Sequence, residues 1–118
     1  MILVDTSVWI DHFRVGSSRL ETLLLAGQVR THRFVLGELA CGSIRRRAKV
    51  LRLLHALPQT VFASDDEVMT LLENHKLYGW GLGWIDVHLL ASALMTPCPL
   101  WTLDRALQRA ARALAVSF

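Results

Sequence analysis

Four acidic residues lie at points where an apolar segment meets a predicted helix. Asp5 ends the first apolar run of the chain, and Asp104 follows the apolar segment PLWT near its end. Glu38 lies within the helical apolar stripe of FVLGELACG, and Asp86 lies near the start of the apolar helix predicted in GLGWIDVHLLASAL. An ionised carboxylate in apolar surroundings is disfavoured unless hydrogen bonds or a cation compensate it. These four acids are therefore the first candidates for chemistry.

Carboxylates gathered in one crevice would favour a bound divalent cation. Two like charges about 4 Å apart repel by roughly 4 kcal/mol at an effective dielectric constant of about 20. Such a group therefore either raises its pKa values or binds a cation. Mg²⁺ and Mn²⁺ prefer carboxylate oxygens, and the histidines and cysteines show no zinc-ligand spacing. Mg²⁺ or Mn²⁺ is the predicted cofactor.

Each acid taken alone also has a purely structural explanation. Asp104 could cap the last helix, Asp86 could stabilise the N-terminus of its own helix, and Glu38 could be a solvated helix residue. Asp5 is the hardest to explain in this way, because it directly follows a fully apolar run. The four acids together, placed around predicted junctions of strands and helices, favour a shared site.

The positions of these acids depend on short strands that alternate with helices. Continuous apolar runs predict strands at residues 1–4, 29–32, 60–63, 100–102 and 116–118. Helical apolar spacing appears between them, around residues 20–24, 35–40, 50–57, 68–72, 85–93 and 107–114, and Ser64 with Glu67 predicts a capping box. This alternation predicts an α/β fold, a three-layer α/β/α sandwich with a short central parallel sheet. In such sheets chemistry takes place at the carboxyl ends of the strands, which is where Asp5 lies.

Length and composition indicate a single domain that spans residues 1–118. The chain is 53% apolar and 19% charged, which argues against intrinsic disorder and supports a core that folds without disulfides or a structural metal. Cys41 and Cys98 are expected to be small buried hydrophobes, although a bridge between them is left open. Since no segment resembles a membrane span or an export signal, we expect a soluble cytoplasmic protein with no membrane partner.

Four segments together resemble the PIN domain, and in particular the VapC-type toxin ribonucleases of bacterial type II toxin–antitoxin pairs. They are VDTSVWID, the most specific of the four, then LGELACG, WIDVHLLASAL and LWTLDRAL, and they are spread over nearly the whole chain. The resemblance implies a PIN-like α/β/α fold and a Mg²⁺ or Mn²⁺ site for RNA phosphodiester cleavage, built from Asp5, Glu38, Asp86 and Asp104. It also implies homodimers and a small cognate antitoxin that covers the acidic site.

Within that site the acids are expected to have different roles. Asp5 and Asp86 are the first choices for ligands of the main ion. Asp104 would complete the site or orient a coordinated water. Glu38 would position or deprotonate the attacking water, or hold a second ion.

Residues around the acids both support and limit this site. Thr6, Ser7 and Thr102 could donate hydrogen bonds to the carboxylates, although turn formation and capping are the simpler role for Ser7. The chain departs from the family pattern at Ala106, where members often carry a further acid. A second metal ion is therefore expected to be weakly held or absent.

The charge distribution suits a polyanionic partner without establishing one. The formal net charge is +3 and the isoelectric point is about 9.4. The cations form two clusters, Arg45, Arg46, Arg47, Lys49 and Arg52, and then Arg105, Arg109 and Arg112. Both are natural contacts for RNA phosphates, although a solvated helix surface is the simpler explanation for each.

Four tryptophans are many for a chain of 118 residues. Trp101 is expected in the core. Trp9, Trp80 and Trp84 are candidates for an exposed apolar surface that binds a protein partner.

Two other classes of function are weighed against the ribonuclease. A receiver-like signalling domain would need a pair of acids directly after the first strand, whereas Asp5 is followed by Thr6. A degenerate PIN domain could act as a non-catalytic interaction or binding module, but all four acids are present.

Overall fold

The first strand lies at the centre of a small parallel sheet. The computed structural model describes residues 1–118, and its three strands are β1 (Ile2–Val4), β2 (Val29–Arg30) and β3 (Leu100–Trp101). Their order is β2-β1-β3, with Leu3 aligned to Arg30 on one side and to Leu100 on the other. The sheet therefore brings the carboxyl ends of β1 and β3 together.

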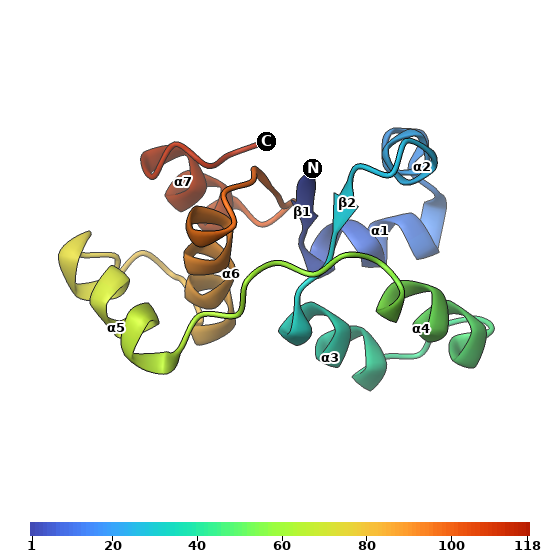
Figure 1. The fold of residues 1–118 in the computed structure, drawn as a ribbon, viewed down its shortest axis with the longest axis horizontal. Helices are drawn as coiled ribbons and strands as arrows, with labels where there is room; N and C mark the ends of the chain where they lie inside the picture. Colours follow the sequence, from blue (N-terminus) through green and yellow to red (C-terminus); the bar gives the residue numbers. More distant parts are fainter.

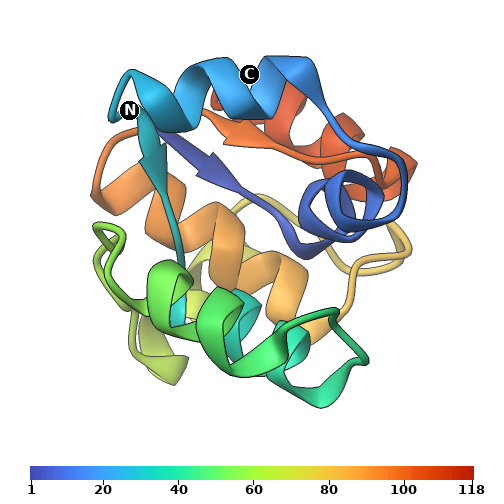
Figure 2. The same cartoon turned by 90° about the vertical axis from the view of Figure 1, so that its right-hand side faces the viewer.

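Seven helices cover the two faces of this sheet. They are α1 (Thr6–Val15), α2 (Ser18–Leu25), α3 (Arg33–Cys41), α4 (Arg47–His55), α5 (Asp65–Asn74), α6 (Trp84–Met95) and α7 (Arg105–Ala113). Helices α1 to α4 lie on one side of the strands and α5 to α7 on the other (Figure 1; Figure 2). The predicted three-layer α/β/α sandwich with a short central parallel sheet is thereby confirmed.

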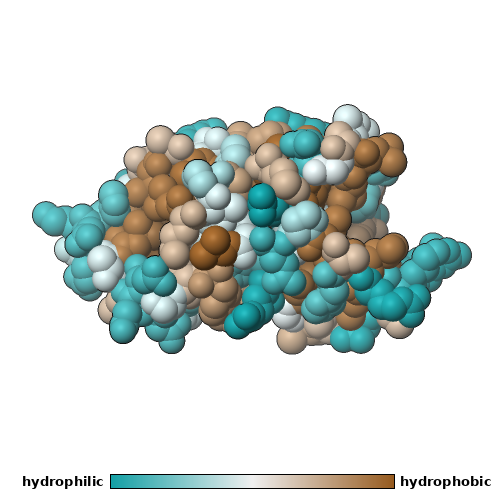
Figure 3. All heavy atoms as spheres, in the orientation of Figure 1, coloured by the Kyte–Doolittle hydropathy of each residue, from teal (hydrophilic) through white to brown (hydrophobic).

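The core forms where β1 meets the helix that is apolar on all sides. Leu3 and Val4 are fully buried, and every residue of α6 from 87 to 93 is buried as well. A helix apolar all round is stable only in such a position. The molecule measures 41 × 24 × 22 Å, and hydrophilic side chains project at both ends of its long axis (Figure 3).

The strands predicted at residues 60–63 and 116–118 do not form. Residues 60–63 form no strand, because pairing with the neighbouring segment stops after the Thr31–Gln59 bridge. The Val61 N–H bonds instead to the Thr96 side chain, and the segment continues as a loop to α5. Residues 116–118 contribute one bridge, between Ser117 and Leu100.

Other expectations about single residues are corrected or settled by the fold. Cys98 is buried as expected, but Cys41 is exposed because it ends α3, and both thiols are free. The predicted capping box of Ser64 and Glu67 forms at the start of α5. None of the helices combines the length and the apolar character needed to cross a membrane.

Candidate functional site

Asp5 is held at the junction of β1 and α1 by two hydroxyl groups. Its backbone is extended and its side chain does not cap α1, so the carboxylate is available for other contacts. The residue is only 6% exposed. Ser7 Oγ and Thr102 Oγ1 each donate a hydrogen bond of 2.7 Å to Asp5 Oδ2, while Oδ1 accepts none. The carboxylate is thus fixed in orientation with one oxygen uncommitted.

The same hydroxyls join the β3–α7 junction to the β1–α1 junction. The Leu103 N–H donates to Ser7 Oγ at 3.0 Å, and the Asp104 N–H donates to Thr102 Oγ1 at 3.0 Å. Asp104 in turn caps α7, accepting from the Leu107 N–H at 3.3 Å through Oδ2. The structural explanation for Asp104 as a helix cap therefore applies, and the cap also fixes the acid beside the end of β3.

Glu38 reaches the same end of β1 from another helix. It is exposed on α3, which packs against α1. Thr6 Oγ1, at the start of α1, donates a 2.8 Å hydrogen bond to Glu38 Oε1. Residues far apart in the sequence are thereby linked at the exposed rim of the site.

Asp86 is affected both by burial and by the charges of the three other candidate acids. It lies in the first turn of α6, half-buried, with Oδ2 accepting from the Gly83 N–H at 2.9 Å. Burial raises the pKa of Asp86 above its ordinary value, and the charges of Asp5, Asp104 and Glu38 raise it further against the lowering effect of that N–H. The four carboxylates therefore lie close enough to interact electrostatically.

The carboxylates are not gathered as a ligand cage. No group of three His, Cys, Asp or Glu side chains is arranged to hold a metal ion. Each acid is instead held by a hydroxyl or backbone N–H of the protein. The donor set of hard carboxylate oxygens, together with the raised pKa of Asp86, fits a divalent cation such as Mg²⁺ or Mn²⁺.

The expected surface of exposed tryptophans does not form. Trp9 is only 2% exposed, because α1 turns it into the core where it stacks on Phe13 with ring centroids 6.0 Å apart. Trp80 and Trp101 are partly buried, and Arg109 lies 4.3 Å above the Trp80 ring. Trp84 alone, at 41% exposure, matches the prediction.

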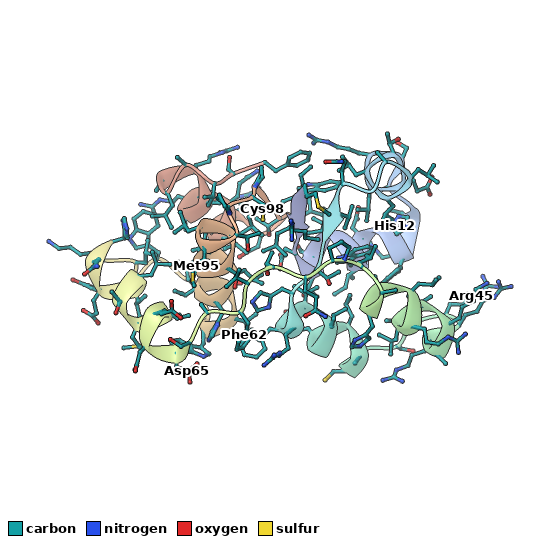
Figure 4. The ribbon with its side chains drawn as sticks, viewed as in Figure 1. His12, Arg45, Phe62, Asp65, Met95 and Cys98 are labelled. Atoms are coloured by element: carbon teal, nitrogen blue, oxygen red, sulfur yellow. The ribbon has the colours of Figure 1, made fainter.

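A cluster of rings around the buried His88 was not evident from the sequence. His88 on α6 is fully buried, and its Nε2 lies 3.2 Å from Asp65 Oδ1. Its ring stacks on Phe62 at a centroid distance of 5.4 Å and meets Phe34 and Trp84 edge-on. Phe62 and Asp65 lie close to one another beside α6 (Figure 4). Since these rings come from separate segments, no periodic signal in the sequence could have predicted the cluster.

Comparisons with known proteins agree with this architecture. The PIN domain profile matches residues 2–113. Two proteins of Mycobacterium tuberculosis, from strains CDC 1551 / Oshkosh and ATCC 25618 / H37Rv, are both named Ribonuclease VapC32. Each is 47% identical to this chain over 111 residues, which cover 93% of this chain and 90% of the relative. The chain therefore belongs to the PIN-domain family, among its VapC-type members.

Proposed function

We propose that residues 1–118 form a single PIN domain that acts as a metal-dependent endoribonuclease toxin. The observations that carry the proposal are the hydrogen bonds that hold Asp5 between the ends of β1 and β3 and Glu38 against Thr6, beside an Asp86 whose pKa is raised by burial and further by the charges of Asp5, Asp104 and Glu38. A divalent cation would offset the repulsion that these charges exert on Asp86. The name Ribonuclease VapC32 of the relatives supports RNA as the substrate, and membership of the VapC-type group supports a cognate antitoxin as the partner.

Asp5 and Asp86 are proposed as the principal ligands of Mg²⁺ or Mn²⁺, with Asp104 completing the site. The bound ion would lower the pKa of a coordinated water and offset the negative charge that develops on the phosphate. Ser7 and Thr102 keep Asp5 oriented, because their hydroxyls occupy Oδ2 and leave Oδ1 for the ion.

Glu38 is proposed to orient or deprotonate the attacking water. Thr6 Oγ1 holds Glu38 Oε1 at 2.8 Å, so Oε2 can accept a proton while the side chain stays in place. A single ion is favoured, because Ala106 supplies no ligand where related domains often carry an acid. Gly81, whose added Cβ would lie 3.7 Å from Ala106 Cβ, packs close to this position.

Cleavage of a panel of single-stranded RNAs tests the proposal. The purified chain should cleave at least one RNA with Mn²⁺ or Mg²⁺ and none in excess EDTA. Asp5→Asn should abolish cleavage while the protein remains folded by circular dichroism. The matched control is Asp66→Asn, which removes an exposed acid from the first turn of α5. Full activity of Asp5→Asn, or indifference to EDTA, would contradict the assignment and favour the non-catalytic PIN module.

Two further elements of the proposal concern assembly. Homodimerisation is predicted from the family resemblance and can be measured by sedimentation velocity of the purified chain. Neutralisation by an antitoxin predicts that coexpression with the protein encoded next to this chain suppresses RNA cleavage.

A further inference from the structure

A groove on the surface of the protein has Glu38 in its lining. It has a volume of about 500 Å³ and lies between the second half of α1 and the loop that joins α3 to α4. Glu38 lines one part of it, and its other lining residues include Phe13, Ile44, Arg14 and Arg45. A proposed catalytic acid and two cations therefore share one groove, which has an apolar wall.

A second hollow continues this groove. Its volume is about 410 Å³, and it is lined by Arg45, Arg46 and Lys49 together with apolar residues of α4. Arg45 lines both hollows. We call the surface formed by Arg45, Arg46 and Lys49 the cationic track; it starts beside the Glu38 groove and follows the first turn of α4.

The cations of this segment are not equivalent. Arg47 is used structurally, since its guanidinium donates a 2.6 Å hydrogen bond to the Ala40 carbonyl and so fixes the α3–α4 loop. Arg45, Arg46 and Lys49 form no ion pair; the pairs in the chain are Arg14–Asp11 and His88–Asp65. Arg45 extends outward at the end of the long axis (Figure 4). The track thus presents three positive charges that no protein acid neutralises.

We propose that the cationic track binds the phosphates of the RNA strand that flanks the cleaved bond, which rests on the function proposed above. Four carboxylates repel a polyanion, so the affinity for RNA must come from cations placed beside them. Phe13 and Ile10 form an apolar wall in the groove against which a base can pack. Uncompensated cations favour a polyanion such as RNA as the ligand of the track, whereas the adjoining hollow between Trp9, Leu24 and Leu57, which shares Phe13 with the groove, is apolar.

The experiment compares two double variants with the same change in net charge. Arg45→Gln/Lys49→Gln removes two charges from the track and leaves the loop contact of Arg47 intact. Arg19→Gln/Lys76→Gln removes two exposed charges that belong to neither basic cluster. Each is measured on active protein for cleavage and, with Asp5→Asn added, for binding of an uncut fluorescent RNA at several salt concentrations.

The track variant should bind RNA at least about tenfold more weakly at low salt. The slope of log K against log salt should flatten by about 1.4, since each phosphate contact on a single strand contributes about 0.7. The KM of the track variant should rise, while its kcat should stay within about twofold of the wild-type value. The control variant should match the wild type in RNA affinity, salt dependence and kinetics. If the wild type cleaves RNA and the track variant equals the control, the inference is wrong while the ribonuclease proposal stands.

Two other outcomes also overturn the inference. Loss of antitoxin binding by the track variant with unchanged RNA affinity would make the track a protein-binding surface. Absence of any RNA binding or cleavage by the wild type would remove the proposed function and the track together. Identical far-ultraviolet circular dichroism and melting curves of the two variants ensure that the comparison concerns binding.

Discussion

His32 is a buried, titratable residue that caps α3, the helix that carries Glu38. Its Nδ1 accepts the Phe34 N–H at 2.9 Å and so caps α3, which places the proton on Nε2, 3.0 Å from Ser92 Oγ. Burial, assisted by the nearby His88 and Arg33, lowers the pKa of His32 to about 4. The neutral ring is therefore the form that caps α3, and protonation of Nδ1 would remove the cap.

The lowered pKa of His32 predicts a loss of stability in mild acid. Between about pH 6.5 and 4 the unfolded chain binds more protons than the folded chain, so the free energy of unfolding falls as pH falls through this range. The loss from this group between pH 7 and pH 5 should be about 2 kcal/mol. His32→Asn keeps a capping acceptor without a titrating ring, and its stability should change less over the same range.

Urea unfolding at pH 7 and pH 5 measures this difference. The absolute stability of His32→Asn will be lower, because the smaller side chain leaves space beside Ser92, so the pH dependence alone is compared. Equal losses in the two proteins would show that His32 is not the group responsible.

At the scale of elements, three helices end in the same way but with different residues. Residues 27, 76 and 115 adopt left-handed backbone conformations with φ of 67°, 50° and 58° after α2, α5 and α7. In each case the following N–H returns to the helix: Gln28 to Leu23, Leu77 to Leu72 and Val116 to Ala111. Only the first of these positions is a glycine, the residue that adopts this conformation without steric cost.

Substitutions at these positions should act in opposite directions. Lys76→Gly and Ala115→Gly should each raise the free energy of unfolding by about 0.5–1 kcal/mol, or the melting temperature by about 3 °C. Gly27→Ala should lower it by about 1 kcal/mol, purely through backbone strain, because an added Cβ there meets no atom within 4 Å. Calorimetry on the three variants gives the signs. If Lys76→Gly and Ala115→Gly both lower the free energy of unfolding, backbone strain at these two positions is not the dominant effect.

The elements also show what the sequence could predict. Strong local signals held: the apolar run of β1, the helical stripes of α4 and α7, and the capping box before α5. The strand expected at residues 60–63 failed because pairing at a sheet edge depends on a partner segment, which the local pattern does not contain. The burial of Trp9 was missed because the sequence does not show how α1 is rotated about its axis against the core.

The site was predictable to a different degree. Positions next to strands and helix starts pointed to Asp5, Glu38, Asp86 and Asp104 as a group. The effect of the other three charges on the pKa of Asp86 could not be predicted, because it depends on the distances at which separate elements place these acids. The cationic track could not be predicted either. The run of arginines does not show that Arg47 donates to a backbone carbonyl while Arg45 and Arg46 form no ion pair.

At the scale of the whole molecule, the proposed metal site predicts that folding and cation binding are coupled. Its four acids are separated along the sequence from residue 5 to residue 104, so they meet only in the folded chain. Without a cation, the raised pKa of Asp86 means that the folded chain holds this proton more tightly than the unfolded chain does. Stability is therefore lost as pH rises from the ordinary value of 3.8 through the raised pKa, and it stays lost at pH 7.

Addition of a divalent cation should consequently reverse the order of stability of Asp86→Asn and the wild type. In EDTA at pH 7 the variant should be the more stable protein, because it loses the unfavourable charge while the amide oxygen of the new side chain can still accept the Gly83 N–H. In Mn²⁺ at about 100 times the dissociation constant, binding should stabilise the wild type by about 2.7 kcal/mol. The variant, with one proposed ligand removed, should gain little.

Thermal unfolding of both proteins in EDTA and in MnCl₂ measures this reversal, and Asp66→Asn is expected to gain as much stability from Mn²⁺ as the wild type does. A lower melting temperature of Asp86→Asn in EDTA would mean that its charge stabilises the fold. An equal gain from Mn²⁺ in both proteins would place the ion elsewhere. Because the measurement needs no RNA, it tests the proposed metal site independently of the identity of the substrate. It therefore shows whether the acids bind a cation together in the folded chain.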